Sequence, residues 1–182
     1  MSVPKQSLYT LEEYNEMREQ SNDLLEYVDG VVYTSPSPST EHQRISAKLH
    51  VRLFNALNGK PCEALAAPFD IVLKKEGVEG NQIVIPDLTV ICDDGGLNEK
   101  NYVGVPEMII EILSPSNQSH DLVLKLRLYQ TYGVKEYWIV DPLTNTILVY
   151  RSDKTYQVVE KGTAQSDVVK GFEVEVEEIF RV

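Results

Sequence analysis

The sequence predicts an α/β fold in which a mixed central β-sheet is flanked by helices and followed by a C-terminal β-meander. Two early segments carry helix capping signals, several short apolar runs typical of strands follow, and one helical segment separates those runs from a last group of strands. The chain has 182 residues, of which 42% are hydrophobic and 25% charged, as in ordinary globular proteins. Because this length suits about one domain, we expect residues 1–182 to form a single domain.

The N-terminal part predicts a helix and then a hairpin. Thr10 and Glu13 have the spacing of a capping box, which places a helix start there and an end near Gln20. Asp29-Gly30 lies between two apolar runs, and this dipeptide suits a two-residue turn because both of its central residues need a positive φ. A helix over about 10–20 and a hairpin over about 24–33 are therefore expected.

The next elements are a second helix and four strands. Thr40 and Gln43 repeat the capping-box spacing, and apolar residues then recur at helical intervals until Gly59. Apolar runs at 62–66, 69–73, 88–92 and 108–113 predict strands, and the nearly continuous last run predicts a central strand covered on both faces. Residues 122–132 consist mostly of helix formers and end at Gly133, so they predict a helix. The meander follows at 136–140, 147–151 and 156–159.

Composition and missing motifs exclude several classes of protein. Lysine and arginine total 17 against 28 aspartates and glutamates, and the net charge of −11 argues against a general nucleic-acid coat protein. No apolar run reaches the ~18 residues that span a bilayer, and no secretory signal precedes the first helix, so we expect a cytoplasmic protein without a membrane partner. Phosphate-loop, dinucleotide-binding, nucleophile-elbow and zincin motifs are absent from the sequence.

The two cysteines, Cys62 and Cys92, each lie in an apolar run typical of a strand. There is no C-x-x-C motif and no pair of histidines beside them, so a zinc site is not expected. Free cysteines are among the most buried residue types in proteins. The pattern therefore predicts two reduced, buried thiols.

Two carboxylates occur where strands are predicted. Asp87 follows Ile83-Val84-Ile85-Pro86 and precedes an apolar run, and Glu111 interrupts the run 108–113. A charge in a covered strand is costly unless another group compensates it. Simpler interpretations are a turn cap for Asp87 and a buried salt bridge for Glu111. If both acids converge at neighbouring strand ends, they form with a backbone carbonyl such as that of Ile112 a hard oxygen site suited to Mg²⁺ or Mn²⁺.

These acids belong to a longer pattern that spans about residues 9–142. Its parts are Glu26 to Gly30, His42, Pro86-Asp87, Glu111 to Ser116, Asp121 with Lys125 and Tyr129, and Tyr132 to Pro142. The pattern resembles the Uma family of endonucleases, in the restriction-endonuclease-like PD-(D/E)XK superfamily. The resemblance implies a restriction-endonuclease-like fold, hydrolysis of DNA phosphodiester bonds by a metal-activated water, and Asp87 and Glu111 as metal-binding acids.

The lysine of the superfamily pattern is not at its usual place. It normally stands two positions after the acid, but position 113 is a leucine. The resemblance implies that Lys125, on the following helix, takes over its catalytic role. The simpler interpretation is a surface pair with Asp121 at i, i+4 spacing. If Lys125 is catalytic, its ammonium should lie within ~4–6 Å of the Glu111 carboxylate, and Asp87 should lie within ~6 Å of Glu111.

Further candidates have competing interpretations. Asp70 and Glu26 are secondary candidates for a metal ligand or for orienting water, and the simpler interpretation is that each forms an ordinary salt bridge. His42 is a candidate phosphate contact, and the simpler interpretation is a solvated histidine in the first turn of a helix. One stripe of the second helix is a candidate contact to the DNA backbone, against an ordinary solvated face. It consists of Arg44, Lys48 and Arg52.

The function most consistent with these features is a Mg²⁺- or Mn²⁺-dependent endonuclease acting on DNA, with a homodimer as a further candidate because nucleases that cut both strands often act as symmetric dimers. The alternative is a non-catalytic interaction or regulatory module that retains the nuclease fold. The missing strand lysine and the negative net charge favour that alternative. The acidic run 173–178 also disfavours DNA in its own neighbourhood.

Overall fold

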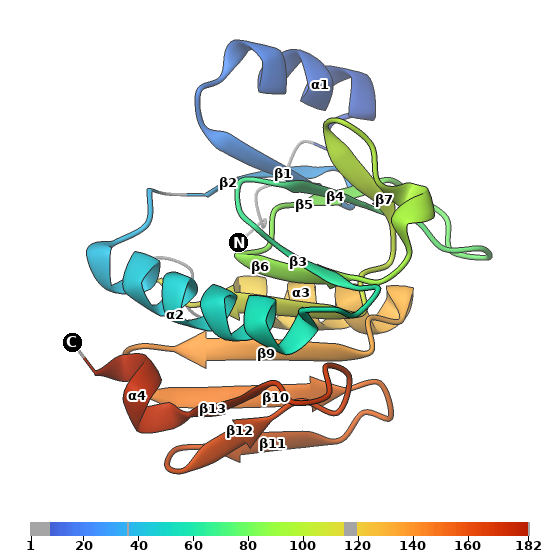
Figure 1. The fold of residues 1–182 in the computed structure, drawn as a ribbon. Helices are drawn as coiled ribbons and strands as arrows, with labels where there is room; N and C mark the ends of the chain where they lie inside the picture. Colours follow the sequence, from blue (N-terminus) through green and yellow to red (C-terminus); the bar gives the residue numbers. More distant parts are fainter. Residues whose placement is uncertain (1–7, 36, 115–119, 182) are drawn as a thin grey trace.

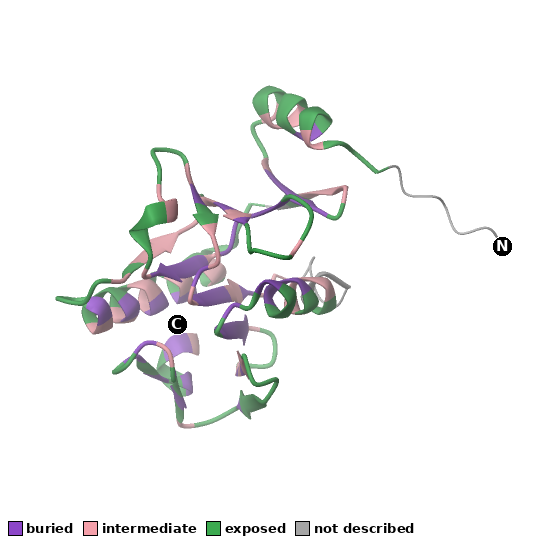
Figure 2. Ribbon diagram, turned by 90° about the vertical axis from the view of Figure 1, so that its right-hand side faces the viewer, coloured by how far each residue is buried: buried purple, intermediate pink, exposed green. Residues whose placement is uncertain are grey.

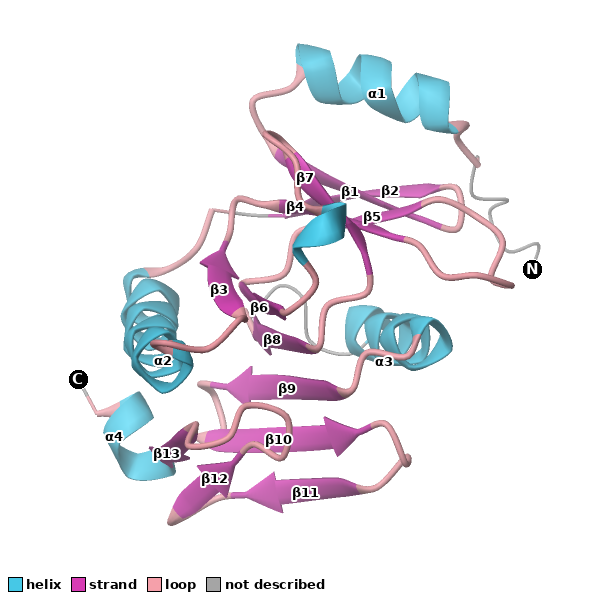
Figure 3. Cartoon of the chain, turned by 45° about the vertical axis from the view of Figure 1, so that its right-hand side comes forward, coloured by secondary structure: helices cyan, strands magenta, loops and turns pink. Residues whose placement is uncertain are grey.

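The structure, a computed structural model, describes residues 8–35, 37–114 and 120–181. Two larger β-sheets lie one above the other, with α1 over the first and with α2 and α3 on opposite sides of the second (Figures 1 and 3). A small two-stranded sheet and α4 close the C-terminal end. The mixed sheets and flanking helices confirm the predicted fold class.

The helices are α1 (Leu11–Gln20), α2 (Thr40–Leu57), α3 (His120–Tyr132), α4 (Val176–Phe180) and the short 3₁₀ helix η1 (Asp94–Gly96). The first sheet has the order β2-β1-β5-β4-β7, with β1 (Leu24–Val28), β2 (Val31–Ser35), β4 (Asp70–Leu73), β5 (Gln82–Val84) and β7 (Asn101–Gly104). The second has the order β11-β10-β9-β8-β6-β3, with β3 (Glu63–Ala66), β6 (Leu88–Ile91), β8 (Met108–Ile112), β9 (Glu136–Asp141), β10 (Thr146–Arg151) and β11 (Tyr156–Val159). The small sheet pairs β12 (Thr163–Gln165) with β13 (Glu173–Glu175).

The local signals at the N-terminus are confirmed. Thr10 caps α1, and both hydrogen bonds of the capping box with Glu13 are present. Asp29 and Gly30 adopt φ values of 51° and 81°, as the turn between β1 and β2 requires. The cap of α2 is Ser39 rather than Thr40, because it is the Ser39 hydroxyl that accepts the backbone N–H of His42.

The alternation of side chains along β8 sets the position of Glu111. Met108, Ile110 and Ile112 pack into the core that contains the apolar face of α2, whereas Ile109 packs into the core that contains α3. Successive strand residues point to opposite faces, so Glu111 points with Ile109 towards α3. The buried residues follow the strands and the inner sides of α2 and α3, while α1 is mostly exposed (Figure 2).

Some elements were not expected from the sequence. β5, β7, β12 and β13 are only three or four residues long, and β7 contains the polar Asn101 and Gly104, so their hydrophobic patterns are too short to identify them. The acidic run 173–178 forms β13 and the first part of α4. The buried residues of these two elements, Val174, Val176 and Ile179, pack into the core with α2.

Cys62 and Cys92 form a disulfide, so the prediction of reduced thiols is wrong. β3 pairs antiparallel to β6 with Glu63 opposite Ile91, and Cys62, just before Glu63, therefore faces Cys92, just after Ile91. Their Cα atoms are consequently 4.0 Å apart. The distance between cysteines along the chain does not reveal such a cross-strand partner. Within the described ranges, no helix combines the length and the apolar character needed to cross a membrane.

Candidate active site

A cleft of about 270 Å³ lies where the start of α2, the start of β6 and the end of β8 come together. Its lining includes His42, Asp87, Glu111, Ile112 and Ser114. β6 and β8 are antiparallel with Leu88 opposite Ile110, so continuing the register by one residue places Asp87 opposite Glu111. The two acids therefore line the same cleft, as expected for groups that serve one site.

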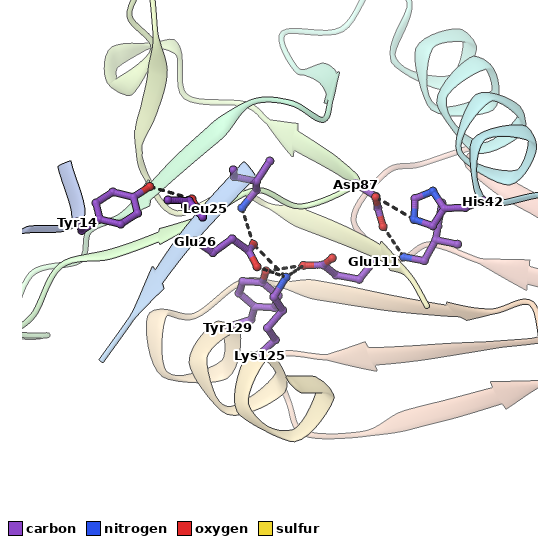
Figure 4. Close-up of polar contacts among 10 residues, drawn as sticks. Tyr14, Leu25, Glu26, His42, Asp87, Glu111, Lys125 and Tyr129 are labelled. Carbon is purple, nitrogen blue, oxygen red and sulfur yellow. Dashed lines mark hydrogen bonds and ion pairs between the residues drawn. The ribbon is translucent and has the colours of Figure 1, made fainter. Parts of the chain in front are cut away.

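Asp87 is held from two directions. Its Oδ2 accepts the backbone N–H of Ile112 at 2.7 Å, and its Oδ1 lies 3.2 Å from Nε2 of His42 (Figure 4). Pro86 precedes Asp87, which begins the segment entering β6. The carboxylate is thus oriented by β8 and by the first turn of α2.

Glu111 takes part in a buried network that reaches α3 and β1. Its Oε1 accepts hydrogen bonds from Lys125 Nζ at 2.9 Å and from Tyr129 Oη at 2.8 Å. Lys125 Nζ also lies 3.0 Å from the carboxylate of Glu26, which accepts the backbone N–H of Ile85 at 2.7 Å (Figure 4). Lys125 therefore points inward to Glu111, within the distance expected of a catalytic lysine, and it is not an outward surface group.

Burial dominates the electrostatics of this network. It raises the pKa of Glu111 to about 7, against the lowering effect of Lys125 and with further increases from Glu26 and Asp87. Burial by itself lowers the pKa of Lys125, but Glu111 and Glu26 raise it more strongly, so Lys125 remains a cation. The pKa of Tyr129 is raised by burial and by Glu111, so its hydroxyl remains a hydrogen-bond donor.

The raised pKa of Glu111 makes stability depend on pH. In the unfolded chain Glu111 titrates near its ordinary value of 4.5, and in the folded, metal-free protein near 7. Its contribution to stability is complete below the lower value and is lost as the pH rises through the higher one. Glutamine does not titrate, so the unfolding free energy of Glu111→Gln minus that of wild type should increase by roughly 1–3 kcal/mol from acidic to neutral pH. Urea titrations of both proteins at several pH values measure this, and a pH-independent difference would contradict it.

His42 is more buried than a solvated first-turn histidine, with 11% of its side chain exposed. Burial alone lowers the pKa of His42. The hydrogen bond and charge of Asp87, together with the backbone of Ile112, raise it by more than burial lowers it, so the net pKa is above the ordinary 6.5. Its Nδ1 is buried without a hydrogen-bond partner among the described residues. The expectation of a solvated His42 is wrong, and the imidazole belongs to the wall of the cleft.

The donor set of the cleft suits a hard divalent cation. No group of three His, Cys, Asp or Glu side chains among the described residues is arranged to hold a metal ion, so an all-protein zinc site is not formed by them. Mg²⁺ usually needs only one or two carboxylates and completes its shell with water. Asp87, Glu111 and the carbonyl of Ile112 meet that requirement beside a cleft of about 270 Å³, which has room for water.

The sequence of the chain matches a known family over most of its length. A sequence model of the Uma2 family, described as "Putative restriction endonuclease", matches residues 11–177. The chain belongs to the Uma2 family. This membership supports a nuclease-like function and confirms the resemblance seen in the sequence.

The chain is also similar to individual proteins in sequence and in structure. The chain is 29% identical over 143 residues to "Uncharacterized protein slr1290" of Synechocystis sp. (strain ATCC 27184 / PCC 6803 / Kazusa), covering 78% of this chain and 73% of that one. It is 24% identical over 144 residues to "Uncharacterized protein sll1609" of the same strain, covering 78% and 79%. A crystal structure of "a putative nuclease belonging to DUF820" from Anabaena variabilis ATCC 29413 superposes with a TM-score of 0.76 at 21% identity, covering 94% and 97%. This last likeness shows the shared fold.

The two secondary carboxylates of this Uma2 chain have different positions. Asp70 pairs with Arg18 of α1 at 3.3 Å and is not part of the cleft lining, so the structure favours the salt-bridge interpretation over a ligand role. Glu26 is 4% exposed and contacts Lys125, which places it in the network of Glu111. Sequence reasoning ranked the two acids equally because both lie in short strands, and only the pairing of β1 with β5 brings Glu26 close to Ile85.

In the basic stripe of α2, Lys48 and Arg52 contact α4, which differs from the expected contact with the DNA backbone. Lys48 Nζ donates to the backbone carbonyls of Glu178, Ile179 and Arg181 at 2.9, 3.1 and 2.5 Å. Arg52 pairs with Glu178 at 2.8 Å. Both cations therefore hold the C-terminal end of α4, where helix carbonyls lack internal partners, and they are not free for DNA phosphates. Arg44 is exposed and keeps its predicted role as a candidate backbone contact.

Replacing Lys48 with methionine should lower the unfolding free energy by about 1–3 kcal/mol, because three carbonyls at the end of α4 lose their charged donor. Replacing the exposed Arg44 with methionine is the matched control and should change stability by less than ~0.5 kcal/mol. Chemical denaturation of both variants measures the effect. Equal stability of the two variants would show that the contacts of Lys48 with α4 contribute little.

Sequence reasoning did not assign a role to Tyr129 or to the backbone of Ile85. Tyr129 follows Lys125 by one helical turn, so both side chains share a face of α3. That spacing was the available signal for Tyr129. No sequence signal pointed to Ile85, because its contribution is a backbone N–H donated to Glu26.

Proposed function

We propose that this chain is a Mg²⁺- or Mn²⁺-dependent endonuclease that hydrolyses phosphodiester bonds of DNA. The observation that carries the proposal is the position of Lys125. It comes from α3, yet its ammonium lies 2.9 Å from Glu111. A lysine on a helix thereby lies beside the strand acid, where the superfamily pattern places a strand lysine.

The residues of the cleft, and Lys125 beside Glu111, suit complementary roles. Asp87, Glu111 and the carbonyl of Ile112 would hold the divalent cation, which supplies a water of lowered pKa and a Lewis acid for the phosphate. Lys125 has three N–H groups, and two of them are donated to Glu26 and Glu111. The third has no acceptor among the described residues, and it would donate to an oxygen of the scissile phosphate and stabilise the negative charge that develops in the transition state.

A nuclease assay tests the proposal directly. Purified protein is incubated with supercoiled plasmid and with Mg²⁺, Mn²⁺ or excess chelator, and Mn²⁺ binding is measured separately by calorimetry. We expect nicked or linear product with either metal and none with chelator. Metal-dependent linear product without a nicked intermediate would further support a homodimer, which light scattering tests independently.

The alternative is a non-catalytic interaction or regulatory module with the same fold. The leucine at position 113 and the net charge of −11 favour it. The assay distinguishes the two: a folded protein that neither binds Mn²⁺ nor cleaves any DNA would replace the proposed enzyme with the module.

A further inference from the structure

Glu26 connects three separate parts of the site. It lies on β1, is 4% exposed, and its carboxylate accepts the N–H of Ile85 at 2.7 Å. Ile85 stands two residues before Asp87, in the segment that presents Asp87 to the cleft. The same carboxylate pairs with Lys125 at 3.0 Å. Glu26 thus links β1, the segment of Asp87 and the lysine of α3 (Figure 4).

Lys125 and a divalent cation need the same carboxylate. The ammonium donates to Oε1 of Glu111, one of the two acids proposed to bind the metal. A cation bound to Glu111 reduces the attraction of that carboxylate for Lys125, and an ammonium on Glu111 reduces its attraction for the metal. Because the side chain of Lys125 is only 16% exposed, its ammonium needs another anionic partner when Glu111 binds the metal.

We propose that Glu26 is a positioning residue that holds the Lys125 ammonium beside the site while Glu111 binds the divalent cation. The inference rests on the proposed function and adds a separate role to it. Glu26 and Glu111 are the two carboxylates that Lys125 contacts among the described residues. Without Glu26, Lys125 depends on Glu111 alone and competes with the metal for it.

The chain offers a control for Glu26 with contacts of the same types. Glu107 also accepts one backbone N–H, that of Cys92 at 2.9 Å, and also faces one lysine, Lys135 at 3.7 Å. It is not part of the cleft lining. Glu26→Gln and Glu107→Gln therefore each remove one negative charge that accepts a backbone N–H and faces a lysine, once inside the site and once outside it, although Lys135 is far more exposed than Lys125.

Two measurements on the full-length variants test the role of Glu26. In Glu26→Gln the Mn²⁺ affinity measured by calorimetry should fall about tenfold, because Lys125 stays on Glu111. At saturating Mg²⁺, kcat for plasmid cleavage should fall about tenfold while KM for DNA stays within about twofold of wild type, because the buried Glu26 does not contact substrate. Glu107→Gln should match wild type in both measurements.

A double-mutant cycle shows whether Glu26 acts through Lys125. Lys125→Gln alone should bind Mn²⁺ about tenfold more tightly, since the competing ammonium is gone. In that background, adding Glu26→Gln should change the affinity by less than about threefold. An unchanged tenfold loss would mean that Glu26 acts on the metal directly, and this would overturn the proposal.

The remaining outcomes separate the two proposals. If wild type binds Mn²⁺ and cleaves DNA but Glu26→Gln behaves like Glu107→Gln, the role of Glu26 is refuted and the enzyme stands. If folded wild type does neither, the enzyme is refuted and the role of Glu26 with it. If Glu26→Gln does not fold, Lys125→Gln alone decides, and an Mn²⁺ affinity no higher than wild type would overturn the proposal.

Discussion

Asp87→Asn should abolish Mn²⁺ binding and lower metal-dependent DNA cleavage by roughly three orders of magnitude, because a catalytic metal contributes several kcal/mol and each 1.4 kcal/mol corresponds to a factor of ten. Asparagine keeps the shape of the side chain and an oxygen that accepts the N–H of Ile112. The fold should therefore remain intact, with melting temperature as the check. The expected loss is one of charge, since the amide no longer attracts a divalent cation.

Asp70→Asn is the matched control for this experiment. Asp70 pairs with Arg18 outside the cleft, so its amide variant should bind Mn²⁺ and cleave plasmid as wild type does. If Asp87→Asn kept full cleavage, Asp87 would not be a metal ligand and its contacts with His42 and Ile112 would have only a structural role. If both variants lost activity equally, general electrostatics would explain the loss.

Lys125→Ala should combine a large loss of activity with a large loss of stability. Cleavage should fall by about 10²–10³, the usual effect of removing one group that stabilises transition-state charge. Loss of a surface pair with Asp121 would leave the fold nearly unchanged, but Lys125 is 16% exposed and lies between Glu26 and Glu111. Its removal leaves two buried carboxylates without a cation, so the unfolding free energy should fall by about 3–5 kcal/mol at pH 8. Lys125→Arg should restore little of the cleavage activity, because the planar guanidinium of arginine replaces the compact ammonium of lysine.

Two comparisons make this prediction specific. Lys135→Ala removes a 61% exposed lysine that lies 3.7 Å from Glu107, and it should leave activity and stability almost unchanged. Added Mn²⁺ should raise the melting temperature of Lys125→Ala more than that of wild type, since the metal compensates the freed carboxylates. A Lys125→Ala variant with full cleavage activity would leave Asp87 and Glu111 as the site and remove Lys125 from it.

Local signals predicted most of the secondary structure for identifiable reasons. The capping box at Thr10, the Asp29-Gly30 turn and the C-terminal Gly133 of α3, with φ of 86°, each depend on a few neighbouring residues. The short strands β5 and β7 depend instead on pairing with other strands, β5 with β4 and with the distant β1, and β7 with β4. The disulfide depends in the same way on the register of β3 with β6.

The sequence by itself determined the fold class, the family resemblance and the two strand acids, because an isolated charge in an apolar strand is visible without any knowledge of its neighbours. Only the tertiary structure decided which cations and acids meet. It brought Lys125 and Glu26 together across 99 positions of the chain, buried His42 against Asp87, and committed Lys48 and Arg52 to α4. The physical reason is that a pattern records periodicity and local propensity, whereas partners separated along the chain are set by strand register and by the face on which each helix packs.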